Sequence, residues 1–147
     1  MVSVSVPANV VGNGAAQAMT TDSTQSNSFF DGFAFCNAPT QLYIGSFYRT
    51  TGNGTATGTV MATVPTSLTN AAGDTIPFTQ ISWTSGGNSD TGAEPYPAGS
   101  FTGTSQTVGS VAQNQWAESC WTFSYKNTVV PAAGTYTGRV IYTLTAP

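Results

Sequence analysis

Short segments in which apolar and polar residues alternate, separated by turn-forming residues, run along the whole chain. The clearest lies at residues 2–11, where Val2, Val4 and Val6 alternate with serines. This period of two places every second side chain on one face, as in a half-buried strand. Helix-forming stretches are nearly absent, because Thr, Ser, Gly, Asn and Gln take the place of the usual helix formers. The pattern therefore predicts an all-β chain.

Turns rich in glycine and proline divide the rest of the chain into further strands. Thr51-Gly52-Asn53-Gly54 predicts a hairpin between strands at 41–49 and 55–64. Residues 12–28 are small and polar and predict a long loop, and residues 85–99, with four glycines and two prolines, predict an irregular loop suited to function. The other predicted strands cover 29–36, in part as a turn, 75–84 with a bulge near Thr79-Gln80, 101–111, 115–125 and 135–145.

The regular spacing of these segments favours one fold class. It predicts a single domain over residues 1–147, an antiparallel immunoglobulin-like β-sandwich of about seven to eight strands. A jelly roll or a barrel is the alternative. No internal repeat or domain boundary interrupts the pattern.

The low charge of the chain excludes some partners. Only 6% of the residues are charged, so the surface must be polar but neutral. Three basic residues and a net charge of −3 leave no basic patch for nucleic acid. No apolar run is long enough to insert into a membrane. Because the chain opens directly on an alternating strand, we expect a mature exported protein in which an initiator Met replaces a removed leader.

Cys36 and Cys120 are the only cysteines, and the chain has no histidine. A four-ligand zinc site is therefore excluded. The simple expectation is a disulfide, which implies an oxidising compartment and a secreted protein. Two reduced, buried thiols are the alternative.

The residues for catalysis or metal binding are sparse. Without histidine, the serine, threonine and cysteine side chains lack an evident activator, and Lys126 is expected to be a solvated surface charge. Asp90 and Glu94 are the only close carboxylate pair, and with Asn88 they match no calcium-loop pattern. Asn53-Gly54-Thr55 fits a glycosylation acceptor, but a hairpin turn already explains it. We expect a non-enzymatic protein without metal or cofactor.

The aromatic residues near Cys120 allow two arrangements. Trp121, Phe123 and Tyr125 share one face of their predicted strand, whereas Cys120 and Trp116 share the other. If Cys120 faces the core, the aromatic stripe points outward, where it could stack on sugar rings or pack on another subunit. In the alternative, which we favour, the stripe lies in the core and the disulfide lies near an edge.

The closing run at 130–145, with proline, small residues, Gly-Thr-Tyr and then an alternating strand, resembles the last strand of bacterial exported β-sandwiches. These families include spore-coat-U-type pilins and cell-wall-binding WxL domains, and Tyr142-Thr143-Leu144 stands where a WxL domain has its second Trp-x-Leu. Chaperone-assembled pilins also resemble this chain in size, in their single disulfide and in a terminal segment that completes a neighbour's sheet. The resemblance implies a protein of the bacterial extracellular surface.

These observations lead to two functional expectations. The first is a structural or adhesive subunit of a pilus-like or fimbrial surface assembly, which associates with itself or with other surface subunits. Residues 2–11 would then be an exchangeable strand, with Val2, Val4 and Val6 as its buried side chains. The alternative is a carbohydrate- or cell-wall-binding β-sandwich module, since a polar, uncharged surface also suits a glycan.

Overall fold

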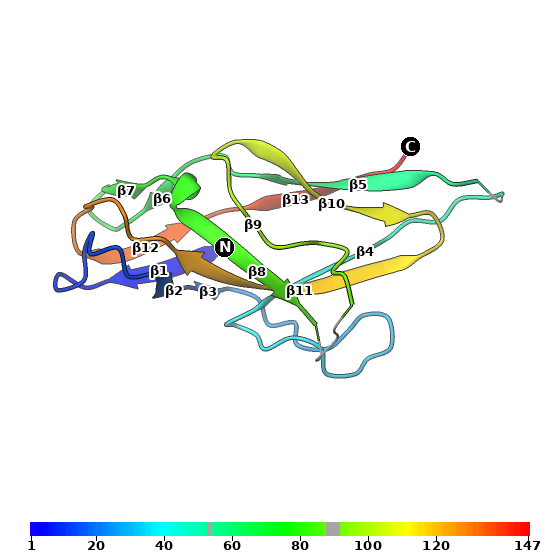
Figure 1. Cartoon of the computed structure of the whole chain (residues 1–147), viewed down its shortest axis with the longest axis horizontal. Helices are drawn as coiled ribbons and strands as arrows, with labels where there is room; N and C mark the ends of the chain where they lie inside the picture. Colours follow the sequence, from blue (N-terminus) through cyan, green and yellow to red (C-terminus); the bar gives the residue numbers. More distant parts are fainter. Residues whose placement is uncertain (53, 88–91) are drawn as a thin grey trace.

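The computed structural model describes residues 1–52, 54–87 and 92–147. It confirms an all-β chain with antiparallel sheets (Figure 1). Within these residues the one helical element is a single 3-10 turn, Phe78–Gln80, and none is long and apolar enough to span a membrane.

The described residues form thirteen strands, many of them short. They are β1 (Val2–Val6), β2 (Gln17–Ala18), β3 (Thr20–Thr21), β4 (Leu42–Phe47), β5 (Thr57–Thr63), β6 (Leu68–Thr69), β7 (Thr75–Ile76), β8 (Ile81–Gly86), β9 (Gly99–Ser100), β10 (Ser105–Ala112), β11 (Trp116–Tyr125), β12 (Gly134–Gly138) and β13 (Ile141–Thr145). One sheet has the order β3-β1-β12-β6-β7, and a second has the order β10-β5-β13. The third has the order β2-β11-β8-β9, and β4 also pairs with β11.

The first two sheets continue one another along the chain. Only Arg139 and Val140 separate β12 from β13, and these strands pair with β6 and β5, which are also consecutive. The pairing of β1 with β12 ends at Val2, which lies opposite Gly138. β13 follows β12 and therefore extends past the first residue of β1. Accordingly, the N-terminus lies between the two ends of the molecule along its long axis, and not at either end (Figure 1).

Aromatic rings from different sheets meet in the core. The rings of Trp83 and Trp121 stack with centroids 4.4 Å apart, and Phe101 packs against Trp83 at 4.8 Å. Trp121 also meets Tyr142 of β13 edge to face, so the core lies between the sheet of β11 and the sheet of β13. Because the chain has few charges, the burial of these large rings is its main favourable contribution to the free energy of folding.

The stripe on β11 belongs to this core. Trp121, Phe123 and Tyr125 are 0%, 1% and 0% exposed. The outward arrangement, in which this stripe would contact a ligand or another subunit, is therefore wrong, and the stripe lies in the core. The disulfide, however, does not lie near a sheet edge, because Cys120 pairs with Tyr43 of β4 on one side and with Gly86 of β8 on the other. Cys120, on the opposite face of β11, is also buried, because a long loop covers that face.

Several predicted elements differ from the observed ones. The prediction of a hairpin between 41–49 and 55–64 is wrong, because β4 pairs with β11 while β5 pairs with β10 and β13 in another sheet. The described residues also form thirteen strands rather than seven to eight, because several strands have only two residues. The segment predicted at 29–36 forms a loop with a single bridge between Asn27 and Ala34. The irregularity near Thr79-Gln80 is a 3-10 turn rather than a bulge, and it leaves Phe78 and Ile81 both buried. The strand predicted at 135–145 is divided into β12 and β13.

Replacing Trp121 by alanine should destabilise the fold strongly. The change would leave a cavity beside Trp83 and remove the donor that Trp121 Nε1 supplies to the Tyr96 carbonyl at 2.9 Å. We expect the free energy of unfolding to fall by about 3–5 kcal/mol in urea titrations. Phe33→Ala is the matched control, because Phe33 is 72% exposed and its loss should change stability by less than about 0.5 kcal/mol. Equal effects of the two changes would contradict this account of the core.

Candidate interaction surfaces

The first strand is held within its own chain. Val2, Val4 and Val6 are 2%, 2% and 0% exposed, and β1 pairs along its whole length with β12 and at its start with β3. The N-terminal ammonium donates a hydrogen bond to Asp22, and this bond lowers the pKa of the Asp22 carboxyl. This exposed pair adds little stability, so β1 is retained mainly by its buried valines and its backbone ladder.

A buried asparagine fixes the loop that follows β1. The side-chain amide of Asn127 donates hydrogen bonds to the carbonyls of Val10 and Ala15 and to Oδ1 of Asn13, and its oxygen accepts one from Gly12 N. Asn127 is fully buried and has a positive φ of 59°, which asparagine tolerates better than most residues. The turn at residues 7–9, between β1 and this anchor, is exposed.

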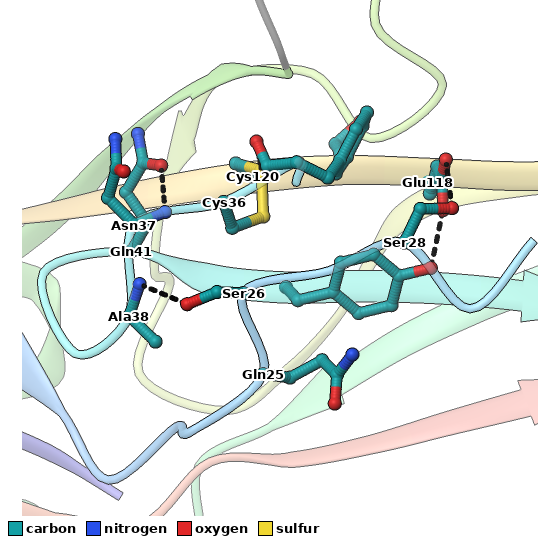
Figure 2. Close-up of a disulfide and its surroundings, with 12 residues drawn as sticks. Gln25, Ser26, Ser28, Cys36, Asn37, Ala38, Gln41, Glu118 and Cys120 are labelled. Carbon is teal, nitrogen blue, oxygen red and sulfur yellow. Dashed lines mark hydrogen bonds between the residues drawn. A yellow bond between two sulfur atoms is a disulfide. The ribbon is translucent and has the colours of Figure 1, made fainter. Parts of the chain in front are cut away.

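The disulfide Cys36–Cys120 is confirmed, with the two Cα atoms 5.6 Å apart. It lies on the outer face of β11 rather than in the aromatic core. There it attaches residues 26–36, which we call the phenylalanine loop, to the sheet (Figure 2). The loop is also closed on itself, because Ser26 O accepts from the amides of Phe35 and Cys36, and Ser28 N donates to Phe33 O.

The phenylalanine loop presents its side chains to solvent. Phe29, Phe30 and Phe33 are 67%, 71% and 72% exposed. Phe47 at the end of β4 is 43% exposed. An exposed apolar group of this size is typical of a contact surface, because single exposed hydrophobic residues are common but clusters are not.

Glu118 is the polar anchor beneath this loop. Its carboxylate accepts hydrogen bonds from Ser28 Oγ at 2.9 Å, from Trp116 Nε1 at 2.8 Å and from the Tyr43 hydroxyl (Figure 2 shows the bond from Ser28). Burial, together with the bond to Glu118, raises the pKa of Tyr43 to about 12. Because donors from the loop, β4 and β11 all point at this half-buried carboxylate, they compensate its desolvation and fix the loop on the sheet.

An open groove of about 640 Å³ runs beside the phenylalanine loop. Its lining combines aromatic rings with amides and hydroxyls: Phe30, Phe35, Pro95, Ser110, Val111, Ala112, Asn114, Gln115, Trp116, Ala117 and Glu118. A smaller hollow beside it is lined by Phe29, Phe30, Phe47, Asn114 and Trp116. The composition of the groove, rather than any titrating group, defines what it could bind.

The described part of the 85–99 loop is packed against the core. Tyr96 is fully buried, and its carbonyl accepts hydrogen bonds from Trp121 Nε1 and Ser85 Oγ. Glu94 accepts one from Ser119. Asn88 and Asp90 lie outside the described residues, as does Asn53, so the structure does not test the carboxylate pair, the calcium ligands or the glycosylation acceptor considered from the sequence. Within the ranges described, no group of three His, Cys, Asp or Glu residues could hold a metal ion.

Comparisons with known proteins give no further guide. No family model, curated protein or solved structure matches this chain. Two features of the molecule are candidates for interaction: the first strand, β1, and the aromatic groove beside the phenylalanine loop.

Removing the disulfide should destabilise the protein and release the phenylalanine loop. The cysteines are 84 positions apart, so in the chain-entropy model the bridge contributes about 4–5 kcal/mol to the free energy of unfolding. The variant with both Cys36→Ala and Cys120→Ala should lose about this amount in urea titrations. Adding a reductant should destabilise the wild type but leave the variant unchanged. A reductant effect on the variant would show that the loss has another cause.

The raised pKa of Tyr43 should make stability depend on alkaline pH. The folded protein keeps the Tyr43 proton up to about pH 12, whereas the unfolded chain releases it near the ordinary value of 10.0. Stability due to Tyr43 is thus fully present below pH 10 and is lost as the pH rises toward 12. The difference in free energy of unfolding between the wild type and Tyr43→Phe should shrink over this window, while other tyrosines affect both proteins equally. A constant difference would contradict the assignment.

Proposed function

We propose that this protein is a non-enzymatic structural or adhesive subunit of a bacterial extracellular surface assembly, built on an immunoglobulin-like β-sandwich. Subunits would join by exchanging β1. One observation carries the proposal: a strand at the chain terminus occupies an interior position of a sheet, between β3 and β12. The disulfide supports export to an oxidising compartment.

Exchange would keep every contact that β1 makes. In a neighbouring copy β1 would enter the same slot, with Val2, Val4 and Val6 buried and the same register opposite β12. Exchange of an identical element is therefore a low-cost route to association. When each subunit gives its strand to the next one, a head-to-tail chain results.

The cost of exchange falls on the connection after β1. The exposed residues 7–9 form the hinge, where Val10 N donates to Pro7 O and closes a turn. Pro7 has a restricted φ and favours an extended backbone at the residue before it. Opening the hinge into an extended segment therefore costs little conformational free energy. Beyond the hinge, the hydrogen bonds of Asn127 to residues 10–15 can remain in place, because only β1 has to move.

The low charge of the subunit suits assembly. β1 has no charged side chain, and neither has β13, which continues past the start of β1. Neutral surfaces can approach one another without repulsion between like charges. The exposed free edge of β13 also lacks the lysines that many proteins use to prevent association at sheet edges.

A pair of single cysteine variants tests the exchange directly. Ser3 of β1 lies opposite Thr137 of β12. If strands exchange, a mixture of Ser3→Cys and Thr137→Cys proteins should form a covalent dimer that contains one copy of each, visible on a non-reducing gel. The protein with both substitutions provides the matched control, because without exchange it forms only the bridge within one chain.

The same samples should be measured by light scattering over a wide concentration range. Oligomers that require residues 1–6 would support the proposal. A strict monomer at every concentration, with no heterodimer in the mixture, would overturn strand exchange.

A further inference from the structure

Three aromatic rings, which we call the aromatic row, lie close together beside the groove. Trp116 of β11 contacts both Phe30 of the phenylalanine loop and Phe47 of β4, and all three rings line the smaller hollow. Each neighbouring ring centroid lies 6.2 Å from that of Trp116, and the planes differ by 32° and 26°. Phe30 and Phe47 are 71% and 43% exposed, so these rings are open to a ligand.

Uncharged polar groups lie next to this row. The side chains of Asn114, Gln115 and Ser110 line the groove. Asn114 is fixed by its positive φ of 59° and by the hydrogen bond that its Oδ1 accepts from Thr50 N. Its side-chain nitrogen makes no hydrogen bond within the described residues, so it can donate to a ligand.

The charges in the groove exclude several classes of ligand. Among the described residues that line it there is no lysine or arginine to bind an anion. Glu118 supplies a single carboxylate, which already accepts three side-chain donors and is a poor partner for a cation. The groove therefore favours a neutral ligand with both apolar faces and hydroxyl groups.

We propose that this groove binds a neutral glycan. The C–H faces of successive pyranose rings would stack on Phe30, Trp116 and Phe47, while the amides of Asn114 and Gln115 would exchange hydrogen bonds with sugar hydroxyls. Because the disulfide and the Ser28–Glu118 bond hold the phenylalanine loop on the sheet, Phe30 is positioned before the ligand arrives. This site is separate from β1, so it does not depend on strand exchange.

Fluorescence titration with neutral oligosaccharides tests the proposal. The probes are cello-, xylo-, malto- and chito-oligosaccharides, together with gel retardation in the corresponding soluble polysaccharides. Trp83 and Trp121 are buried, so a shift of the emission on binding would report on the half-buried Trp116. At least one glycan should bind, and Phe30→Ala or Phe47→Ala should each weaken binding by about five- to tenfold.

Matched variants keep the test independent of folding and of assembly. Val130→Ala removes a residue that is 82% exposed but does not line the groove, and it should leave glycan binding unchanged. Thermal unfolding would verify that the phenylalanine variants remain folded. Binding is also measured at a protein concentration where the chain is monomeric, so that a failure of strand exchange does not affect the result.

Two outcomes would overturn the glycan proposal. One is the absence of binding to every neutral glycan at millimolar concentration. The other is self-association that is lost in the variant with both Phe30→Ala and Phe47→Ala but is insensitive to glycan, which would make the aromatic row an interface between copies of the chain.

Discussion

The core and the phenylalanine loop both depend on β11, because both faces of this strand are covered. On its inner face, Trp121, Phe123 and Tyr125 pack in the aromatic core. On its outer face, Trp116, Glu118 and Cys120 hold the phenylalanine loop by ring contact, hydrogen bonds and the disulfide. The two functions of the strand follow from its alternation, since successive side chains point to opposite sides. One face stabilises the fold, and the other positions an exposed surface.

The scarcity of charge explains how the loops are held. In the described part of the chain, the ion pair between the N-terminus and Asp22 is exposed, and the long loops are fixed instead by hydrogen bonds to single side chains. Asn127 organises the loop after β1, and Glu118 organises the phenylalanine loop. Such bonds depend on geometry and burial more than on ionic strength, because they are screened little by salt. Loops of small polar residues can therefore keep a defined shape.

Alternation was a good guide to the regular part of the fold and a poor one to the rest. The period of two at Val2, Val4 and Val6 marks a real strand, and the disulfide follows from the two cysteines. The sequence alone could not decide which face of β11 is inward, because a covering loop buries Cys120 as fully as Trp121. Only the tertiary arrangement resolves such a case, since both faces carry large side chains.

The phenylalanine loop shows a different limit. Phe29, Phe30 and Phe33 resemble residues of a core by their chemistry, and the sequence predicts a strand over part of this segment. Their spacing does not alternate as in a strand, and the Asp31-Gly32 turn between them is the signal for exposure: Gly32 has a φ of 79°, which neither a strand nor a helix accommodates. Apolar residues gathered around such a turn, rather than along a strand, are a pattern that marks a candidate contact surface in other sequences.

The two proposed surfaces are physically compatible. β1 belongs to the sheet of β12, whereas the aromatic row is built from β4, β11 and the phenylalanine loop, so an exchanged strand leaves the groove unchanged. A chain of subunits joined by β1 would repeat the groove at regular intervals. Weak binding of a glycan at each groove would then add up along a long polysaccharide, because each bound subunit raises the effective concentration of ligand at the next. Assembly would in this way convert a low-affinity groove into an adhesive surface.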